Sequence, residues 1–193
     1  TFFKTKVKKK ENLMGSNYPS NFVDSATLDV FCNEIISLNP SAVLIGGDIS
    51  DSKNIEKTLL ILEEKIQCPL YFVLGNHDFY HGSIIDVREE VQKISNSSSY
   101  LQYLTNTGII KLTSTSCLIG HDSWSDGRYG DFSKSDIRLN DYVMIKELAN
   151  LNKQERLEKL NALGDEAVVF FREQLSQALQ NFQHIFILTH VPP

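Results

Sequence analysis

The 193-residue sequence lacks paired cysteines, a long apolar run and a surplus of basic residues. Its three cysteines, Cys32, Cys68 and Cys117, show no C-x-x-C spacing, which argues against a zinc knuckle or a redox pair and is typical of buried thiols in a reducing compartment. No apolar stretch is long enough to span a bilayer, so we expect no membrane contact and a cytoplasmic location. The formal net charge of −5 disfavours nucleic acid as a partner, because an acidic surface repels phosphates.

What remains is the composition of an ordinary globular domain. Hydrophobic residues make up 41% of the chain and charged residues 22%, and the length suits one domain with a substantial core. We therefore expect a single domain over residues 1–193. The sequence does not indicate the oligomeric state.

Helical and extended segments alternate along the chain. Apolar residues at helical spacing predict helices near 24–38, 53–66, 83–94, 141–163 and 165–182, the last two separated by Gly164. Short apolar runs bounded by turn residues predict strands at 42–45, 70–74, 109–112, 117–119 and 184–188. This alternation is typical of an α/β protein with a largely parallel central sheet. The first helix is expected to be capped by Asp24 or Ser25 and to bury Leu28, Phe31, Ile35 and Leu38.

Potential metal ligands and proton carriers follow three of the predicted buried strands. These segments are Gly46-Gly47-Asp48 with Asp51 one turn on, Gly75-Asn76-His77-Asp78, and Thr189-His190. In α/β sheets, sites form where the carboxyl ends of strands enter loops, and glycine lets the backbone turn sharply there and approach an ion closely. Each segment alone is more simply an ordinary turn or a hydrogen-bonded loop. All three in this order predict one common site, with their three strands adjacent in one sheet.

The side-chain types at these positions indicate which metals would bind. Carboxylate, amide and imidazole groups form a hard-to-intermediate ligand set, which suits Mn, Fe or Zn and differs from a thiolate site. The cysteines lie outside all three segments.

Three motifs carry a resemblance to a known family. Gly47-Asp48-Ile49-Ser50-Asp51, Gly75-Asn76-His77-Asp78 and the strand-terminal His190 resemble, in order and context, the central motifs of the calcineurin-like metallophosphoesterase superfamily, from about Ala42 to the C-terminus. The resemblance implies an α/β fold of two packed mixed β-sheets flanked by helices. It also implies hydrolysis of phosphate mono- or diesters, with a small phosphate ester or a nucleotide as substrate.

The resemblance further implies a role for each matched residue. Asp48 would bridge two metal ions, and Asn76 and His190 would ligate the second of them. His77 would protonate the leaving group while a metal-bridging hydroxide attacks phosphorus, and Asp51 would orient His77 and favour its protonated form. Asp78 is about equally well explained as a brace of its own loop.

The match fails at both ends of the family pattern. An Asp-x-His before the first motif and a Gly-His-x-His after His190 are both missing from the sequence. The chain is therefore interpreted as a domain without the first and last family motifs, and we expect it to bind one of the two metal ions or none. We favour a piece of a longer protein over two alternatives: a natural pseudo-enzyme, and ligands supplied by His121 or by another chain.

The polar stretch at 120–140 holds further candidates for substrate binding. His121 and Asp122 follow a predicted strand and are read equally well as rim residues that contact substrate or as a histidine paired to its loop neighbour. Arg128 has the forked donors that suit phosphate, although surface arginines are commonly solvated. Trp124, Tyr129 and Arg138 complete a possible lid over the metals.

Two functional classes follow from these observations. The first is a metallophosphoesterase, and the second is a non-catalytic scaffold with the same fold that binds a protein partner. A scaffold has no need to keep Asp48, Asp51, Asn76, His77 and His190 together, which favours the enzyme.

Overall fold

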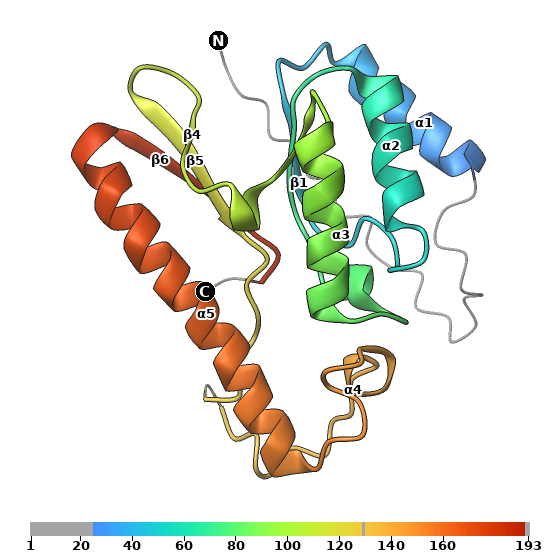
Figure 1. Cartoon of the computed structure of the whole chain (residues 1–193), viewed down its shortest axis with the longest axis vertical. Helices are drawn as coiled ribbons and strands as arrows, with labels where there is room; N and C mark the ends of the chain where they lie inside the picture. Colours follow the sequence, from blue (N-terminus) through green and yellow to red (C-terminus); the bar gives the residue numbers. More distant parts are fainter. Residues whose placement is uncertain (1–24, 129, 192–193) are drawn as a thin grey trace.

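The computed structural model describes residues 25–128 and 130–191, which form two three-stranded sheets with helices on their outer faces. The expected Asp24 cap and the lid residue Tyr129 lie outside the described residues. Helices α1, α2 and α3 gather on one side of the molecule and the long helix α5 lies on the other (Figure 1). The α/β fold of two packed sheets flanked by helices is therefore confirmed.

The first sheet is built from β-α-β units. Its strands are β1 (Val43–Gly46), β2 (Leu70–Val73) and β3 (Leu101–Tyr103), all parallel and in the order β1-β2-β3. Helix α2 (Ile55–Ile66) connects β1 to β2, and α3 (Ile84–Ser97) connects β2 to β3, while α1 (Ser25–Ser37) precedes β1. Short 3₁₀ turns follow β2 and β3, at His77–Phe79 and Leu104–Asn106.

The second sheet is mixed. Its strands are β4 (Ile110–Lys111), β5 (Ser116–His121) and β6 (His184–Thr189); β4 pairs antiparallel to β5, and β5 pairs parallel to β6. A long crossover joins β5 to β6 through the short helix α4 (Asp141–Met144) and the 29-residue helix α5 (Lys153–Asn181). A capping box formed by Asn152 and Glu155 starts α5.

Alternating side chains of the strands divide the core into layers. In β2, Leu70 and Phe72 pack against the helices, while Tyr71 and Val73 face the second sheet. In β5, Cys117 and Ile119 pack against α5, and Leu118 meets the first sheet. The two sheets therefore bury a shared apolar layer and bring their carboxyl ends close together.

Four sequence predictions differ from the structure. The first concerns the buried face of α1, which is Leu28, Cys32 and Ile35, whereas Phe31 is 47% and Leu38 is 62% exposed. Only the narrow stripe that meets α2 is covered, so Phe31 and Leu38 remain at the surface. The second is β3, which the sequence analysis missed because a three-residue strand shows too little pattern.

The third difference is the sheet to which the last strand belongs. The apolar run of β6 predicted a strand adjacent to β1 and β2, but β6 pairs with β5 in the second sheet. The run also predicted a covered strand, whereas β6 is the edge strand of its sheet, with Phe186 43% and Ile187 50% exposed. A continuous apolar run does not indicate which strand lies beside it.

The fourth difference concerns the helices expected at 141–163 and 165–182. Gly164 was expected to separate them and instead lies inside α5, while the first is interrupted between the end of α4 at Met144 and the start of α5 at Lys153. A Cβ at Gly164 would lie 3.0 Å from the Cβ of Asp126 and 3.4 Å from the guanidinium of Arg128. Glycine here allows the 120–140 loop to pack closely on the helix.

None of the described helices is long and apolar enough to cross a membrane.

Candidate metal centre

The loops that follow β1, β2 and β6 converge although they come from two different sheets. The ring of His190, which follows β6, places Nδ1 2.7 Å from the carbonyl oxygen of Gly46 at the end of β1. Its Nε2 lies 3.2 Å from Oδ1 of Asn76 and 3.5 Å from Oδ1 of Asp48. The structure thus brings together the three side chains that the sequence analysis singled out as metal ligands.

Tight backbone geometry makes this approach possible. Gly47 has φ +90° and Asp48 has φ +55°, a left-handed conformation that glycine and aspartate tolerate better than most residues. A Cβ on Gly75 would overlap Oδ1 of Asp48 and lie 2.7 Å from Cε1 of His190. The glycines predicted to allow close approach are therefore the ones whose missing side chains leave room for the cluster.

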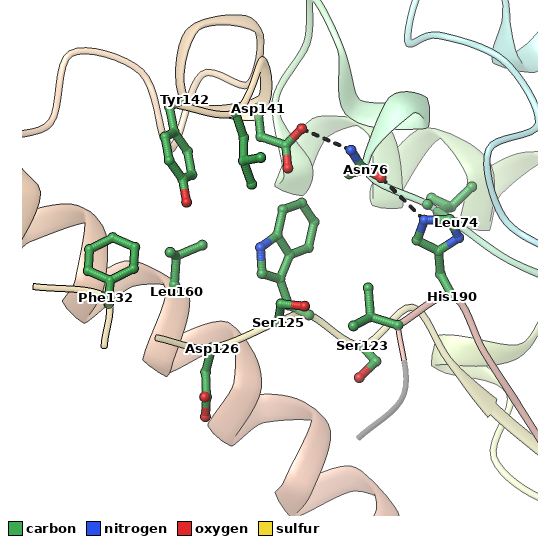
Figure 2. Close-up of a pocket in the computed structure, with 14 residues that line it drawn as sticks. Leu74, Asn76, Ser123, Ser125, Asp126, Phe132, Asp141, Tyr142, Leu160 and His190 are labelled. Carbon is green, nitrogen blue, oxygen red and sulfur yellow. Dashed lines mark hydrogen bonds between the residues drawn. The ribbon is translucent and has the colours of Figure 1, made fainter. Parts of the chain in front are cut away.

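The orientation of Asn76 is fixed by a residue that the sequence analysis missed. Its Nδ2 donates to Oδ1 of Asp141 at 2.8 Å, so its Oδ1 turns toward His190 (Figure 2). The hydroxyl of Tyr80 also donates to Oδ1 of Asp141, at 2.7 Å. Burial and the neighbouring Asp141 carboxylate raise the pKa of Tyr80, which keeps its hydroxyl protonated as a donor.

The atoms that face one another at the centre are all hydrogen-bond acceptors when Nδ1 of His190 carries the ring proton. In that tautomer Nδ1–H donates to Gly46, and Nε2 presents a lone pair to the amide oxygen of Asn76 and the carboxylate of Asp48. A cation among them relieves this repulsion. A backbone carbonyl that accepts the far N–H of a histidine is also the usual way in which a metal-ligating imidazole is held.

The spacing of these atoms fits one metal ion. Two donors that each lie about 2.1 Å from an ion at a tetrahedral angle are roughly 3.4 Å apart, close to the 3.2 Å and 3.5 Å observed here. Among the described residues, no group of three His, Cys, Asp or Glu side chains is arranged to hold a metal. The third donor of the cluster is the amide of Asn76, which is none of these four types.

One buried carboxylate, that of Asp78, connects the β1 and β2 loops, which carry Asp48 and Asn76. Asp78 accepts the N–H of Ser50 and the N–H of Gly75, both at 2.7 Å, and so ties the β1 loop to the β2 loop. Burial raises the pKa of Asp78 to about 7, although these two N–H donors act in the opposite direction.

A family model provides the deciding comparison. The model described as calcineurin-like phosphoesterase matches residues 22–193 of the chain. The chain belongs to the calcineurin-like phosphoesterase family. Neither a curated protein nor a solved structure matches it significantly. The family resemblance drawn from the motifs around Asp48, Asn76 and His190 is thus confirmed, while the role of each residue stays a prediction.

The predicted proton donor of this calcineurin-like phosphoesterase lies beside the cluster. The backbone N–H of His77 donates to Oδ1 of Asp48 at 3.2 Å, and the half-buried imidazole stacks on Tyr80 with ring centroids 4.5 Å apart. Asp51 is 2% exposed, and its Oδ1 accepts the N–H groups of Lys53 and Asn54 at the start of α2. Its orientation of His77 stays a prediction.

The candidates for substrate binding at 121–128 are held by other parts of the fold. His121 is 2% exposed, accepts the N–H of Ser123 at Nδ1, and packs against Phe170 of α5. This is the arrangement of a histidine paired to its loop neighbour. Arg128 is half exposed and forms ion pairs with Asp126 and Asp165 at the surface of α5.

Asp122, also expected at the rim, is 1% exposed and connects four parts of the fold. Its carboxylate accepts from the backbone N–H of Leu74 at 2.7 Å and from Arg88 of α3 at 2.9 Å. It also accepts from the hydroxyls of Tyr103, which ends β3, and of Thr105 after it. Its backbone oxygen accepts the N–H of His190 at 3.3 Å. Asp122 therefore positions both the loop that carries Asn76 and the residue that ends β6.

Proposed function

We propose that residues 1–193 are the catalytic domain of a metal-dependent phosphoesterase that hydrolyses mono- or diesters of small molecules, including nucleotides. The observation that carries the proposal is the convergence of Asp48, Asn76 and His190, whose acceptor atoms face one another as though around a cation. The glycines that leave room for them and the bond that turns Asn76 inward both support a metal site.

The donor set suits Mn, Fe or Zn. One ion would be held by Asp48, Asn76 and His190, and a second ion would share Asp48. When bound, these ions supply Lewis acidity to phosphoryl oxygens and a lowered pKa for water. The described residues offer three donors to the ion held by Asn76 and His190, and only Asp48 to the other ion.

The residues of the chain itself would then position the phosphate and donate a proton to the leaving group. Asn76 and His190 fix the position of the phosphate by holding the ion. His77 is the proposed general acid, because it lies next to Asp48 and an ester oxygen needs a proton as it leaves. The stack on Tyr80 holds the imidazole in one place, and Asp51 is proposed to support its charged form.

The proposed setting is the cytoplasm. Cys32, Cys68 and Cys117 are all free thiols, as expected of a protein kept in a reducing compartment. The negative net charge of −5 supports a small substrate over nucleic acid.

The test is hydrolysis of a chromogenic monoester and a chromogenic diester by metal-stripped protein, with Mn, Fe or Zn added back. We expect activity to return with metal and to be lost in Asp48→Asn. Asp29→Asn, a change at an exposed carboxylate on α1, is the matched control and should keep activity. A protein that neither binds metal nor hydrolyses any ester would support the alternative, a scaffold with a phosphoesterase fold.

A further inference from the structure

A cavity of about 290 Å³ adjoins the candidate metal centre. Asn76, Asp141 and His190 line one end of it, and Phe132, Tyr142 and Leu160 lie at the opposite end (Figure 2). The walls come from the 120–140 loop, from α4 and from α5, so segments outside the family motifs enclose this space. The family motifs contribute only the end that carries the metal ligands.

The wall away from the metal centre is apolar. It consists of aromatic and branched side chains, namely Trp124, Phe132, Leu139, Tyr142 and Leu160. None of the described lining residues is a lysine or an arginine. The two carboxylates in the lining are already bonded, Asp141 to Asn76 and Tyr80, and Asp126 to Arg128. Such a wall suits an uncharged group and disfavours a second phosphate.

Contacts behind the wall hold it open. The ring of Trp124 packs against the buried Phe79, with centroids 5.9 Å apart. The guanidinium of Arg156 lies 4.4 Å from the centroid of Tyr142, a cation–π contact that fixes the tyrosine ring. Leu160 is 4% exposed and is held by α5. The cavity is therefore preformed, which lowers the entropic cost of binding a rigid group.

We propose that this cavity binds the non-phosphate part of the substrate, and that the preferred substrates are phosphoesters of compact, uncharged alcohols that carry an aromatic ring. The inference rests on the proposed function, because a phosphate held near Asn76 and His190 would direct its ester group into this space. Ligand pockets usually measure about 300–1,000 Å³, so a cavity at the lower limit takes a group of one ring.

The experiment compares phenethyl phosphate with ethyl phosphate, two alkyl esters with similar leaving groups, on the metal-loaded protein. We expect kcat/KM to be at least about tenfold higher for phenethyl phosphate, because the ring buries apolar surface in the cavity. Leu139→Asp places a charge at a lining position that is 46% exposed, so the fold should persist while this ratio falls toward one. Leu179→Asp, at a 71% exposed position of α5 outside the lining, should keep the ratio.

A second readout is independent of turnover. Trp124 is the only tryptophan of the chain, so its fluorescence reports directly on the cavity. Phenethylphosphonate should change the emission with saturation at a lower concentration than ethylphosphonate. Equal kcat/KM for the two esters, or an unchanged ratio in Leu139→Asp, would overturn the inference. If neither ester is hydrolysed, monoester hydrolysis is excluded from the proposed function, and equal saturation by the two phosphonates would then overturn the cavity assignment separately.

Discussion

Nδ2 of Asn76 donates to Oδ1 of Asp141 at 2.8 Å, across 65 residues of sequence. Because a carboxylate only accepts, this bond determines which atom of the amide faces His190. Asp141 is 8% exposed and also accepts from Tyr80, so it is itself held in place. The presentation of an oxygen to the candidate metal centre thus depends on a residue outside the family motifs.

Asp141→Ala should weaken metal binding about 10- to 100-fold, the usual loss when a partner that orients a ligand is removed. Without this acceptor the amide of Asn76 is free to turn its Nδ2 toward His190. Asp141→Asn retains a side-chain oxygen and should show a smaller loss. The measurement is calorimetric titration with Zn or Mn, with Asp136→Ala in the exposed loop as control. An affinity of Asp141→Ala equal to that of the control would exclude the orienting role.

Gly75→Ala and Gly46→Ala form a matched pair. A Cβ at Gly75 meets Asp48 and His190, whereas a Cβ at Gly46 meets nothing within 4 Å. Gly75→Ala should lower the affinity for metal at least about 10-fold. It should also lower the free energy of unfolding by about 1–3 kcal/mol, because the added methyl group overpacks the site. The free energy of unfolding of Gly46→Ala should stay within about 0.5 kcal/mol of that of the parent protein. Metal titration and thermal unfolding measure both effects, and similar behaviour of the two variants would contradict the proposed close packing at Gly75.

Asp122→Asn should destabilise the fold by about 1–3 kcal/mol, because it leaves the largely buried Arg88 with only the exposed Glu166 as a charged partner and breaks bonds to Tyr103 or Leu74. Asp131→Asn, at an exposed carboxylate, is the control and should change the free energy of unfolding by less than about 1 kcal/mol. Urea denaturation measures the free energy of unfolding of both variants. A small effect of Asp122→Asn would indicate that Asp122 does not hold the strand ends together.

His77→Ala should reduce turnover by about 10²- to 10⁴-fold while metal remains bound, because His77 is proposed to act outside the coordination shell. The loss should shrink for nitrophenyl esters, whose leaving groups depart without a proton. Asp51→Asn should show a milder form of the same dependence. Steady-state kinetics over a series of leaving groups, with metal content measured in parallel, test this assignment. Equal slowing of good and poor leaving groups, or loss of metal, would exclude His77 as the proton donor.

The sequence predicted the positions of the candidate ligands well because each follows an apolar strand directly. The ends of β1, β2 and β6 are marked by local signals, an apolar run followed by glycine or by a polar residue. The buried face of α2 is also marked by a local signal, the helical spacing of its apolar residues Ile55, Leu59, Leu62 and Ile66. The convergence of Asp48 with His190 then follows from strand ends that meet.

What could not be predicted depends on contacts distant in sequence. No local pattern links Asp141 to Asn76, or Asp122 to Leu74 and Arg88. The continuity of α5 through Gly164 depends on how closely the Asp126 loop packs, which a helix-breaking residue alone does not indicate. The apolar cavity is likewise built from segments that meet only in the folded chain.

The central claim is that Asp48, Asn76 and His190 bind a metal ion, and anomalous X-ray diffraction from metal-loaded crystals tests it most directly. The account predicts an anomalous peak about 2.0–2.2 Å from Nε2 of His190, with oxygens of Asn76 and Asp48 in the same coordination shell. Nδ1 of His190 should still face the carbonyl of Gly46. Peaks found only away from Asp48, Asn76 and His190, or no peak at saturating metal with Nε2 bonded directly to Asn76, would contradict the account.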